Sequence, residues 1–296
     1  MSGGKGAKKE KKRPLRKRRR WGWSAALVLL TAWLLWGNLT VGLTKIDVFS
    51  TQVPAEFEGY RIAHISDLHN ASFGSENGRL LKVLRDAEPD IIAITGDLID
   101  SRRTDIPAAV SFAREAMKIA PCYYVTGNHE ARSGMAERLK EELEAAGVIV
   151  LENERVEIAR DGARIVVLGV EDPAFYAGTW RRHAAGIISE HTTALMKEGD
   201  GFTIALSHRA ELFDAYAECG VDLALCGHAH GGQFRLPFLG GVAAPNQGFF
   251  PEYDAGLFTR GETNMVVSRG IGNSIFPLRI NNRPEVVLIR LQRMPD

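Results

Sequence analysis

The segment from Tyr60 to His69 reads YRIAHISDLH. A short run of mostly apolar residues leads directly into Asp67 and His69, whose side chains can bind metal ions. Continuous apolar runs of this length are typical of strands buried in a parallel sheet. Ligands in α/β folds gather beyond the carboxyl ends of such strands, so a binding site is expected here.

Four further apolar runs end in the same way. IIAIT leads to Asp97, YYVT to Asn128 and His129, TIALS to His208, and LALC to His228 and His230. Gly96, Gly127 and Gly227 precede three of these groups, which fits tight turns that aim a side chain inward. If the strands lie side by side, eight candidate ligands converge at one edge.

The charge of the chain is split between a basic tail and an acidic body. Residues 1–20 contain eleven Lys or Arg and one Glu, so they carry +10. The whole chain carries +1, and the remaining residues therefore carry −9. An acidic body argues against a nucleic-acid-binding domain, which usually presents a basic face. We predict no nucleic-acid partner.

Residues 21–43 contain no charged residue and carry Trp21, Trp23 and Trp36 near the ends. About 20 apolar residues span a bilayer as a helix, and indole rings favour its interfaces. A cleaved secretory signal would have a shorter apolar region of roughly 7–15 residues and a small-x-small site, so an uncleaved signal anchor is predicted. The basic tail, residues 1–20, should stay in the cytoplasm. This predicts a single-pass protein of the cell membrane whose body is extracytoplasmic.

The body begins with a predicted linker, residues 44–58, followed by one domain over 59–296. Its first half alternates strands with helices, the latter including 106–119 and 133–146, and its last third is mostly strand. This order predicts an α/β fold of two sheets packed face to face with helices outside. The aromatic-rich loop 231–256 is expected to tuck into the core. Alternatively, it forms an apolar lip that accepts a lipid tail or rests on the bilayer.

The candidate ligands are carboxylates, imidazoles and one amide, which suit Mn, Fe or Zn. They are too many for a single ion. An Asp carboxylate can bridge two ions held about 3.5–4 Å apart, so a two-metal site is predicted. A scaffold that only binds partners could lose metal ligands without consequence. All the candidate ligands are present in this chain, which favours an enzyme.

The ordered blocks DxH, GD, GNHE, H and GHxH resemble those of the calcineurin-like metallophosphoesterases, from Tyr60 to about Gln233. The string GHAHGGQ, with the anchor, resembles the membrane-associated bacterial phosphodiesterase branch of that family. The resemblance implies a four-layer α/β/β/α sandwich and a dinuclear metal centre. One ion would be held by Asp67, His69, Asp97 and His230, and the other by Asp97, Asn128, His208 and His228. Asp97, Asn128 and His129 would be the catalytic residues, with His129 not a ligand.

The expected cofactors are two divalent or trivalent ions, with Mn the first choice. A metal-bridging hydroxide would attack phosphorus in line. The resemblance implies phosphodiester or pyrophosphate hydrolysis on a membrane-associated or lipid-linked substrate, such as a UDP-diacylglucosamine-like glycolipid. The alternatives are a metal-dependent hydrolase of carbon esters or amides and a non-catalytic membrane-anchored scaffold. No protein partner is indicated.

Several other polar residues have two interpretations. Glu130 either orients the site or lies on the surface, and Arg102 and Arg103 either meet an anionic substrate or are solvated. Cys122 and Cys226 are predicted to be buried free thiols, although a disulfide between Cys219 and Cys226 is conceivable.

Overall fold

The computed structural model describes residues 15–176, 180–273 and 276–294, so most of the predicted basic tail lies outside the described residues. The chain divides into two compact units, residues 1–36 and 37–296. Helix α1 (Leu15–Leu39) runs through the first unit. Its segment Trp21–Leu39 has a mean hydropathy of 1.3 and no buried residue, and it is long and apolar enough to cross a membrane.

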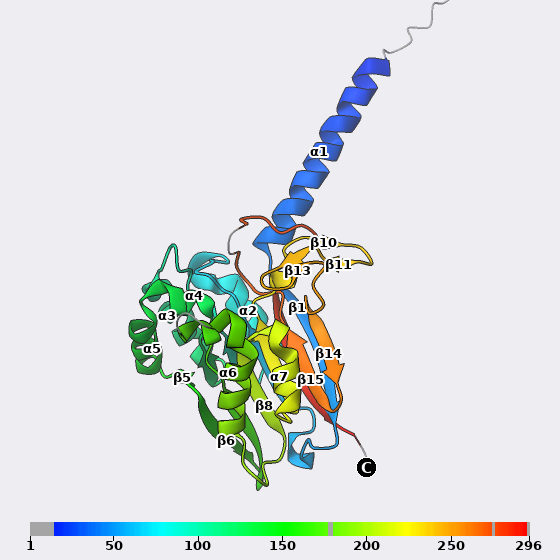
Figure 1. The fold of residues 1–296 in the computed structure, drawn as a ribbon. Helices are drawn as coiled ribbons and strands as arrows, with labels where there is room; N and C mark the ends of the chain where they lie inside the picture. The colour runs from blue at the N-terminus through cyan, green and yellow to red at the C-terminus, as the bar shows by residue number, and fades with distance from the viewer. Residues whose placement is uncertain (1–14, 177–179, 274–275, 295–296) are drawn as a thin grey trace, which may run out of the picture. The chain divides into compact units, whose positions relative to one another are not determined.

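The second unit contains two six-stranded mixed sheets (Figure 1). The first has the order β1 (Gly42–Ser50), β16 (Glu285–Arg293), β2 (Arg61–Ile65), β3 (Ile91–Thr95), β4 (Cys122–Val125) and β5 (Ile149–Val150). The second has the order β14 (Gly256–Arg260), β15 (Thr263–Val267), β9 (Leu223–Gly227), β8 (Thr203–Arg209), β7 (Ala163–Gly169) and β6 (Glu154–Arg160). Strands β2 to β5 are mutually parallel, as are β7, β8, β9 and β15.

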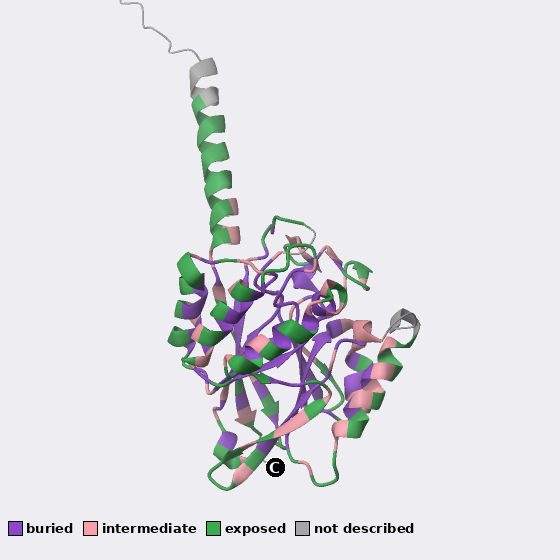
Figure 2. Ribbon diagram, turned by 90° about the vertical axis from the view of Figure 1, so that its left-hand side faces the viewer, coloured by how far each residue is buried: buried purple, intermediate pink, exposed green. Residues whose placement is uncertain are grey.

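Successive side chains along these strands pack alternately into the core between the sheets and into the core beneath the helices. Ile91 and Ala93 of β3 pack between the sheets, whereas Ile92 and Ile94 pack outward. This period of two is the geometry of a strand. The outer face of the first sheet is covered by α2 (Gly78–Ala87), α3 (Ile106–Met117) and α5 (Ala136–Ala145). Helices α6 (Trp180–Leu195) and α7 (Phe213–Glu218) cover the second sheet. The central strands of both sheets are buried and the helices expose their outer sides (Figure 2), which confirms the four-layer sandwich.

Residues 44–58 differ from the predicted linker, and residues 40–43 differ from the predicted span. Helix α1 ends at Leu39, and β1 pairs in parallel with β16 from Gly42↔Glu285 to Ser50↔Arg293. The folded unit therefore includes residues well before 59. The partner strand lies about 240 positions away in the sequence. Because β1 mixes polar with apolar residues at a sheet edge, it lacks the continuous apolar run of a buried strand.

The loop 231–256 forms two short hairpins. They pair β10 (Arg235–Leu236) with β11 (Gly240–Gly241) and β12 (Ala243–Ala244) with β13 (Gly248–Phe249). Phe234 packs edge-on against Phe276, with ring centroids 5.3 Å apart. Phe238, Leu239, Phe249 and Phe250 are exposed, so the prediction that this loop tucks its aromatics into the core is wrong for them.

Candidate metal centre

The predicted ligands meet where the carboxyl ends of strands from both sheets come together. Strands β2, β3 and β4 of the first sheet and β8 and β9 of the second lead into the groups that the sequence singled out. All eight side chains are buried: Asp67, His69, Asp97, Asn128, His129, His208, His228 and His230. The structure thus brings together residues up to 163 positions apart in the sequence.

The candidate ligands form three groups, and the ligand atoms within each group all lie within 4.8 Å of one another. One consists of Asp67, His69 and His230, the second of His69, Asp97 and His129, and the third of Asp97, His208 and His228. In the first, Nε2 of His230 lies 3.3 Å from Oδ1 of Asp67 and 3.1 Å from Nε2 of His69. In the third, Nε2 of His208 lies 3.2 Å from Oδ2 of Asp97. Asp97 belongs to two of the three groups.

Five of these residues have a left-handed backbone. Their φ angles are 55° for Asp67, 48° for His69, 51° for Asp97, 67° for His228 and 49° for His230. This region costs about 1–3 kcal/mol per residue outside glycine and persists where the surroundings over-determine it, often at functional sites. This backbone conformation brings the side chains that follow the strand ends together in the ligand groups.

The glycines before the ligands serve mainly to let the loops approach. Gly96 has φ 80°, and a Cβ there would lie 2.7 Å from Cα of Gly127 and 2.8 Å from Nδ1 of His208. Gly127 has an ordinary extended backbone, but its Cβ would lie 2.6 Å from the backbone nitrogen of Asp97. Close contact between the two loops, rather than the predicted tight turn, therefore requires glycine at Gly127.

The carboxylates of Asp67 and Asp97 and the imidazoles beside them shift one another's pKa values. Burial lowers the pKa of His208, but the carboxylates of Asp97 and Asp67 outweigh burial and raise that pKa to about 10. Burial alone would raise the pKa of Asp97; His208 and His69 hold it well below its usual range. Burial lowers the pKa of His69 to about 3 and holds that of His228 well below its ordinary value. His69 and His228 are therefore neutral imidazoles, the form that ligates metals.

His129 is held in one tautomer by the loop after β3. Its Nδ1 accepts a hydrogen bond from the backbone N–H of Ser101 at 3.0 Å. The proton of the neutral ring is therefore on Nε2, which lies 4.0 Å from Oδ2 of Asp97. The backbone N–H of His129 donates to Oδ1 of Asp97 at 2.7 Å. This arrangement presents an N–H donor toward the ligand cluster.

The chain matches the sequence model of the calcineurin-like phosphoesterases over residues 60–232. It belongs to that family. The match spans the five blocks and all eight residues of the cluster.

Three curated relatives share most of the chain. YkuE of Bacillus subtilis, an uncharacterized metallophosphoesterase, is 27% identical over 84% of this chain and 85% of its own length. The phosphodiesterase YaeI of Escherichia coli is 29% identical over 78% and 82%, respectively. A transmembrane protein with a metallophosphoesterase domain from Bos taurus is 30% identical over 86% of this chain and 57% of that protein. The chain is thus a metal-dependent phosphoester hydrolase.

Glu130 has a structural role that the sequence left open. It is fully buried, and its Oε2 accepts hydrogen bonds from the backbone N–H groups of Asp97 and Gly127, each at 2.8 Å. Its Oε1 accepts from the N–H of Ile99 at 3.1 Å. Burial and the nearby Asp97 raise the pKa of Glu130 to about 7, against the effect of the N–H donors. The alternative that Glu130 lies on the surface is wrong: this carboxyl joins the loops after β3 and β4.

Replacing Glu130 with alanine should therefore destabilise the fold and misplace Asp97. Three buried N–H groups would lose their acceptor, at about 1–3 kcal/mol each. We expect the thermal unfolding midpoint of the full chain in detergent to fall by on the order of 10 °C. The Glu130→Gln variant retains one carbonyl oxygen for two of the three donors and should fall by less. Equal midpoints for wild type and Glu130→Ala would contradict this role.

The second sheet contributes a support that the sequence did not reveal. Arg209 is buried and forms a two-pronged ion pair with Asp172, with N–O distances of 2.6 and 2.9 Å. Its Nη1 lies 3.0 Å from Nε2 of His228, and Nδ2 of Asn246 lies 3.1 Å from the same atom. The only signal in the sequence is the position of Arg209 beside His208. From the sequence alone, an arginine at this position could equally be a solvent-exposed residue.

Two adjoining cavities open over the cluster. One, of about 210 Å³, is lined by Asp97, Ser101, Arg102, Asn128, His129, Arg132, His228, His230, Pro245 and Asn246. The other, of about 640 Å³, is lined by His69, Asn70, Asp100, Arg102, Arg103, Asp105, Asn273 and Pro277. Both include Arg102, whose side chain is about half exposed and paired with Asp100 at 2.7 Å. The cluster is therefore accessible, and Arg102 lies in the wall of both cavities.

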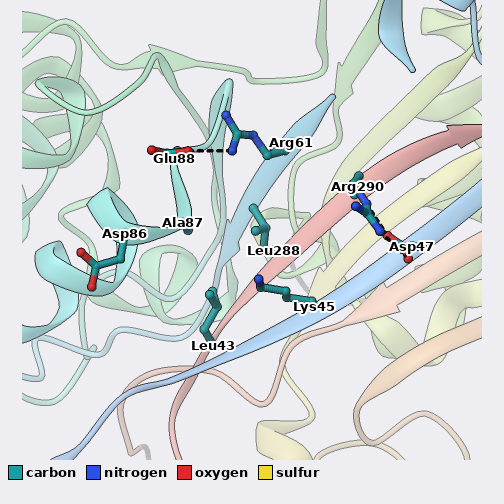
Figure 3. Close-up of a pocket in the computed structure, with 9 residues that line it drawn as sticks. All are labelled: Leu43, Lys45, Asp47, Arg61, Asp86, Ala87, Glu88, Leu288 and Arg290. Atoms are coloured by element: carbon teal, nitrogen blue, oxygen red, sulfur yellow. Dashed lines mark hydrogen bonds and ion pairs between the residues drawn. The ribbon is translucent and has the colours of Figure 1, made fainter. Parts of the chain in front are cut away.

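A further cavity, of about 450 Å³, lies on the outer face of the first sheet beside α2 (Figure 3). Its charges are mostly paired with one another: Arg61 with Glu88 at 3.0 Å, and Arg290 with Asp47 at 2.7 Å. It contains none of the histidines of the centre. All three cysteines are free thiols, and Cys122 and Cys226 are buried as predicted, so a Cys219–Cys226 disulfide is not formed.

Proposed function

We propose that this chain is a membrane-anchored dinuclear phosphodiesterase or pyrophosphatase. One ion would be held by Asp67, His69, Asp97 and His230, and the other by Asp97, Asn128, His208 and His228. The observation that carries this proposal is that Asp97 groups with His69 on one side and with His208 and His228 on the other. A carboxylate with two oxygens is the bridging ligand that a two-metal site requires.

The donor set fits two cations. Nε2 of His208 is buried without a well-formed hydrogen bond, although it lies 3.2 Å from a carboxylate oxygen of Asp97. The side-chain amide of Asn128 lies 2.8 Å from Nδ1 of His228, so both groups reach the same point. A cation bound by Nε2 of His208 would give that buried nitrogen a partner. When bound, the two cations would neutralise phosphoryl oxygens and lower the pKa of a coordinated water, with Mn the first expectation among Mn, Fe and Zn.

The residues of the chain would then divide the remaining work. His129, with its proton on Nε2, would donate to the oxygen of the leaving group as negative charge develops there. Arg102 at the cavity wall would attract the anionic substrate. The backbone N–H of Ser101 keeps the ring of His129 in the donating tautomer.

The substrate is proposed to be associated with the membrane or linked to lipid, as in a UDP-diacylglucosamine-like glycolipid. The apolar helix α1 supports this, because it would hold the site beside a bilayer. The basic tail would remain in the cytoplasm and place the catalytic unit on the extracytoplasmic side of the cell membrane. The name of the relative YaeI supports the preference for phosphodiesters.

The full chain in detergent should hydrolyse an aryl phosphodiester or a pyrophosphate once loaded with Mn, Fe or Zn in turn. A matched carbon ester and an amide should be turned over far more slowly. Preference for the carbon ester would favour the alternative hydrolase. The absence of turnover with every metal would favour a non-catalytic scaffold.

Water labelled with heavy oxygen tests the direct displacement. In a single turnover on a chiral phosphodiester, the label should appear in the phosphate product with inversion at phosphorus. Retention would mean that the chain itself forms a covalent phosphoryl intermediate, and it would reject this mechanism.

A further inference from the structure

A group of large apolar side chains beside the site is exposed to solvent. We call Phe238, Leu239, Phe249, Phe250, Leu278 and Ile280 the apolar rim. Phe238 is fully exposed, and Phe249 is 79% exposed. Isolated exposed apolar residues are common, but a contiguous group of this kind marks an interaction surface.

Hydrogen bonds join the two segments that carry the rim. Nε2 of Gln233 donates to the carbonyls of Phe276 at 3.0 Å and Leu278 at 2.8 Å. The backbone N–H of Arg235 donates to the carbonyl of Ile280 at 3.0 Å. The hairpin that holds Phe238 is therefore fastened to the segment that holds Leu278 and Ile280. The backbone N–H of Phe250 donates to the carbonyl of Val242 in the same loop at 2.9 Å.

Two members of the rim are held outward at an energetic cost. Phe238 has φ 69° and Phe250 has φ 56°, both in the left-handed region. A bulky residue is rare there, and glycine or asparagine would be favoured. Neither ring is buried within the protein, so the fold does not recover this strain. A ligand outside the protein that buries the rings would do so.

The rim lies next to the point where the chain leaves the apolar helix. The side chain of Asn38, one residue before the end of the span, donates to the carbonyl of Arg279 at 2.9 Å and accepts from its N–H at 2.8 Å. Arg279 lies between Leu278 and Ile280 in the sequence. If Trp21–Leu39 crosses a bilayer, the chain leaves it one residue after Asn38, and these two rim residues are tied to that point of exit.

The same arginine reaches the metal centre. Its buried guanidinium donates to the carbonyl of Arg269 at 2.7 Å, and Nη2 lies 3.4 Å from Nδ1 of His230. The 640 Å³ cavity that begins at His69 extends to Pro277, next to Leu278. Arg279 and the 640 Å³ cavity therefore both reach from the apolar rim to the candidate metal ligands.

We propose that the apolar rim inserts into the lipid bilayer that holds α1 and that the 640 Å³ cavity opens to the bilayer surface. This inference rests on the proposed membrane span and specifies the substrate class as a lipid whose phosphate enters from the membrane. Burying aromatic side chains at an interface stabilises such an orientation in proportion to apolar area.

Spin labels on the full chain in vesicles of phosphatidylcholine and phosphatidylglycerol test the insertion. Single labels would be placed by Phe238→Cys and Phe249→Cys in a Cys219→Ser background, because Cys122 and Cys226 are buried. The matched control is Phe49→Cys, an exposed phenylalanine of β1. It lies seven residues beyond Gly42, roughly 23 Å along the strand.

Labels at the rim should relax more readily with oxygen than with an aqueous nickel chelate, and the label at Phe49 should show the reverse. Equal accessibility to the chelate at all three positions would overturn the insertion. A chain that does not float with the vesicles would overturn both the insertion and the proposed anchor. Lack of phosphoesterase activity would leave the labelling result intact, so the two proposals fail separately.

A paired variant links insertion to turnover. Phe238→Asn with Phe250→Asn suits the left-handed backbone, so the fold should be retained. We expect at least a tenfold loss of turnover on a phosphodiester embedded in vesicles and unchanged turnover on a water-soluble aryl phosphodiester. An equal loss on both substrates, or on neither, would contradict the role of the rim.

Discussion

Asp97→Asn should lower kcat/KM on an aryl phosphodiester by at least on the order of 10³-fold. Oδ2 of Asp97 lies 3.2 Å from Nε2 of His208 and 3.6 Å from Nε2 of His69, one in each proposed ligand set. The amide lacks the negative charge and the second oxygen that a bridge between two cations needs. Both ions should therefore bind more weakly, and the metal content should fall below about two per chain.

The substitution leaves the backbone largely undisturbed. Asp97 has φ 51°, and asparagine tolerates the left-handed region as well as aspartate does. The amide oxygen can still accept from the N–H of His129, so a fall in metal content can be separated from unfolding. Asp86→Asn, at an exposed aspartate of α2 paired with Lys82, is the control and should match the wild type. An Asp97→Asn enzyme with two tightly held metals and full activity would refute the shared-ligand proposal.

His129→Ala should lower kcat by about 10²–10⁴-fold while metal content and KM change little. The ring is not in either proposed ligand set, and its Nδ1 is occupied by the N–H of Ser101. Its contribution is then the donor on Nε2, aimed at charge that develops in the reaction. The effect should be larger for an alkyl leaving group than for a 4-nitrophenyl group, because the better leaving group needs less stabilisation.

His191→Ala is the matched control, since His191 lies on α6 beside Tyr176 and away from the cluster. It should leave the kinetics unchanged. If His129→Ala instead loses metal in step with activity, then His129 is a ligand. If its loss is independent of the leaving group, donation to the leaving oxygen is incorrect.

The strands and their ligands could be predicted because each is encoded locally. An apolar run such as IAHIS and the Asp67 that follows it are adjacent in the chain, so burial and chemistry can be read together. The burial of Glu130 could not be read in this way. Its three donors come from loops that meet only in the folded protein, and a glutamate after GNH is otherwise an ordinary surface residue. The same holds for Arg209, whose partner Asp172 lies 37 positions away.

The order of the five ligand blocks, the alternation of strands with helices in the first half of the body, and the apolar segment after a basic tail can be read from the chain alone. These are properties of neighbouring residues and of their hydrophobic periodicity. The folded protein is needed to see that β1 completes a sheet with β16, that Gly127 is needed for loop contact, and that Phe238 and Phe250 are exposed. Each of these depends on which distant segments come into contact, because hydrogen bonds and close packing act through space between residues that are far apart in the chain.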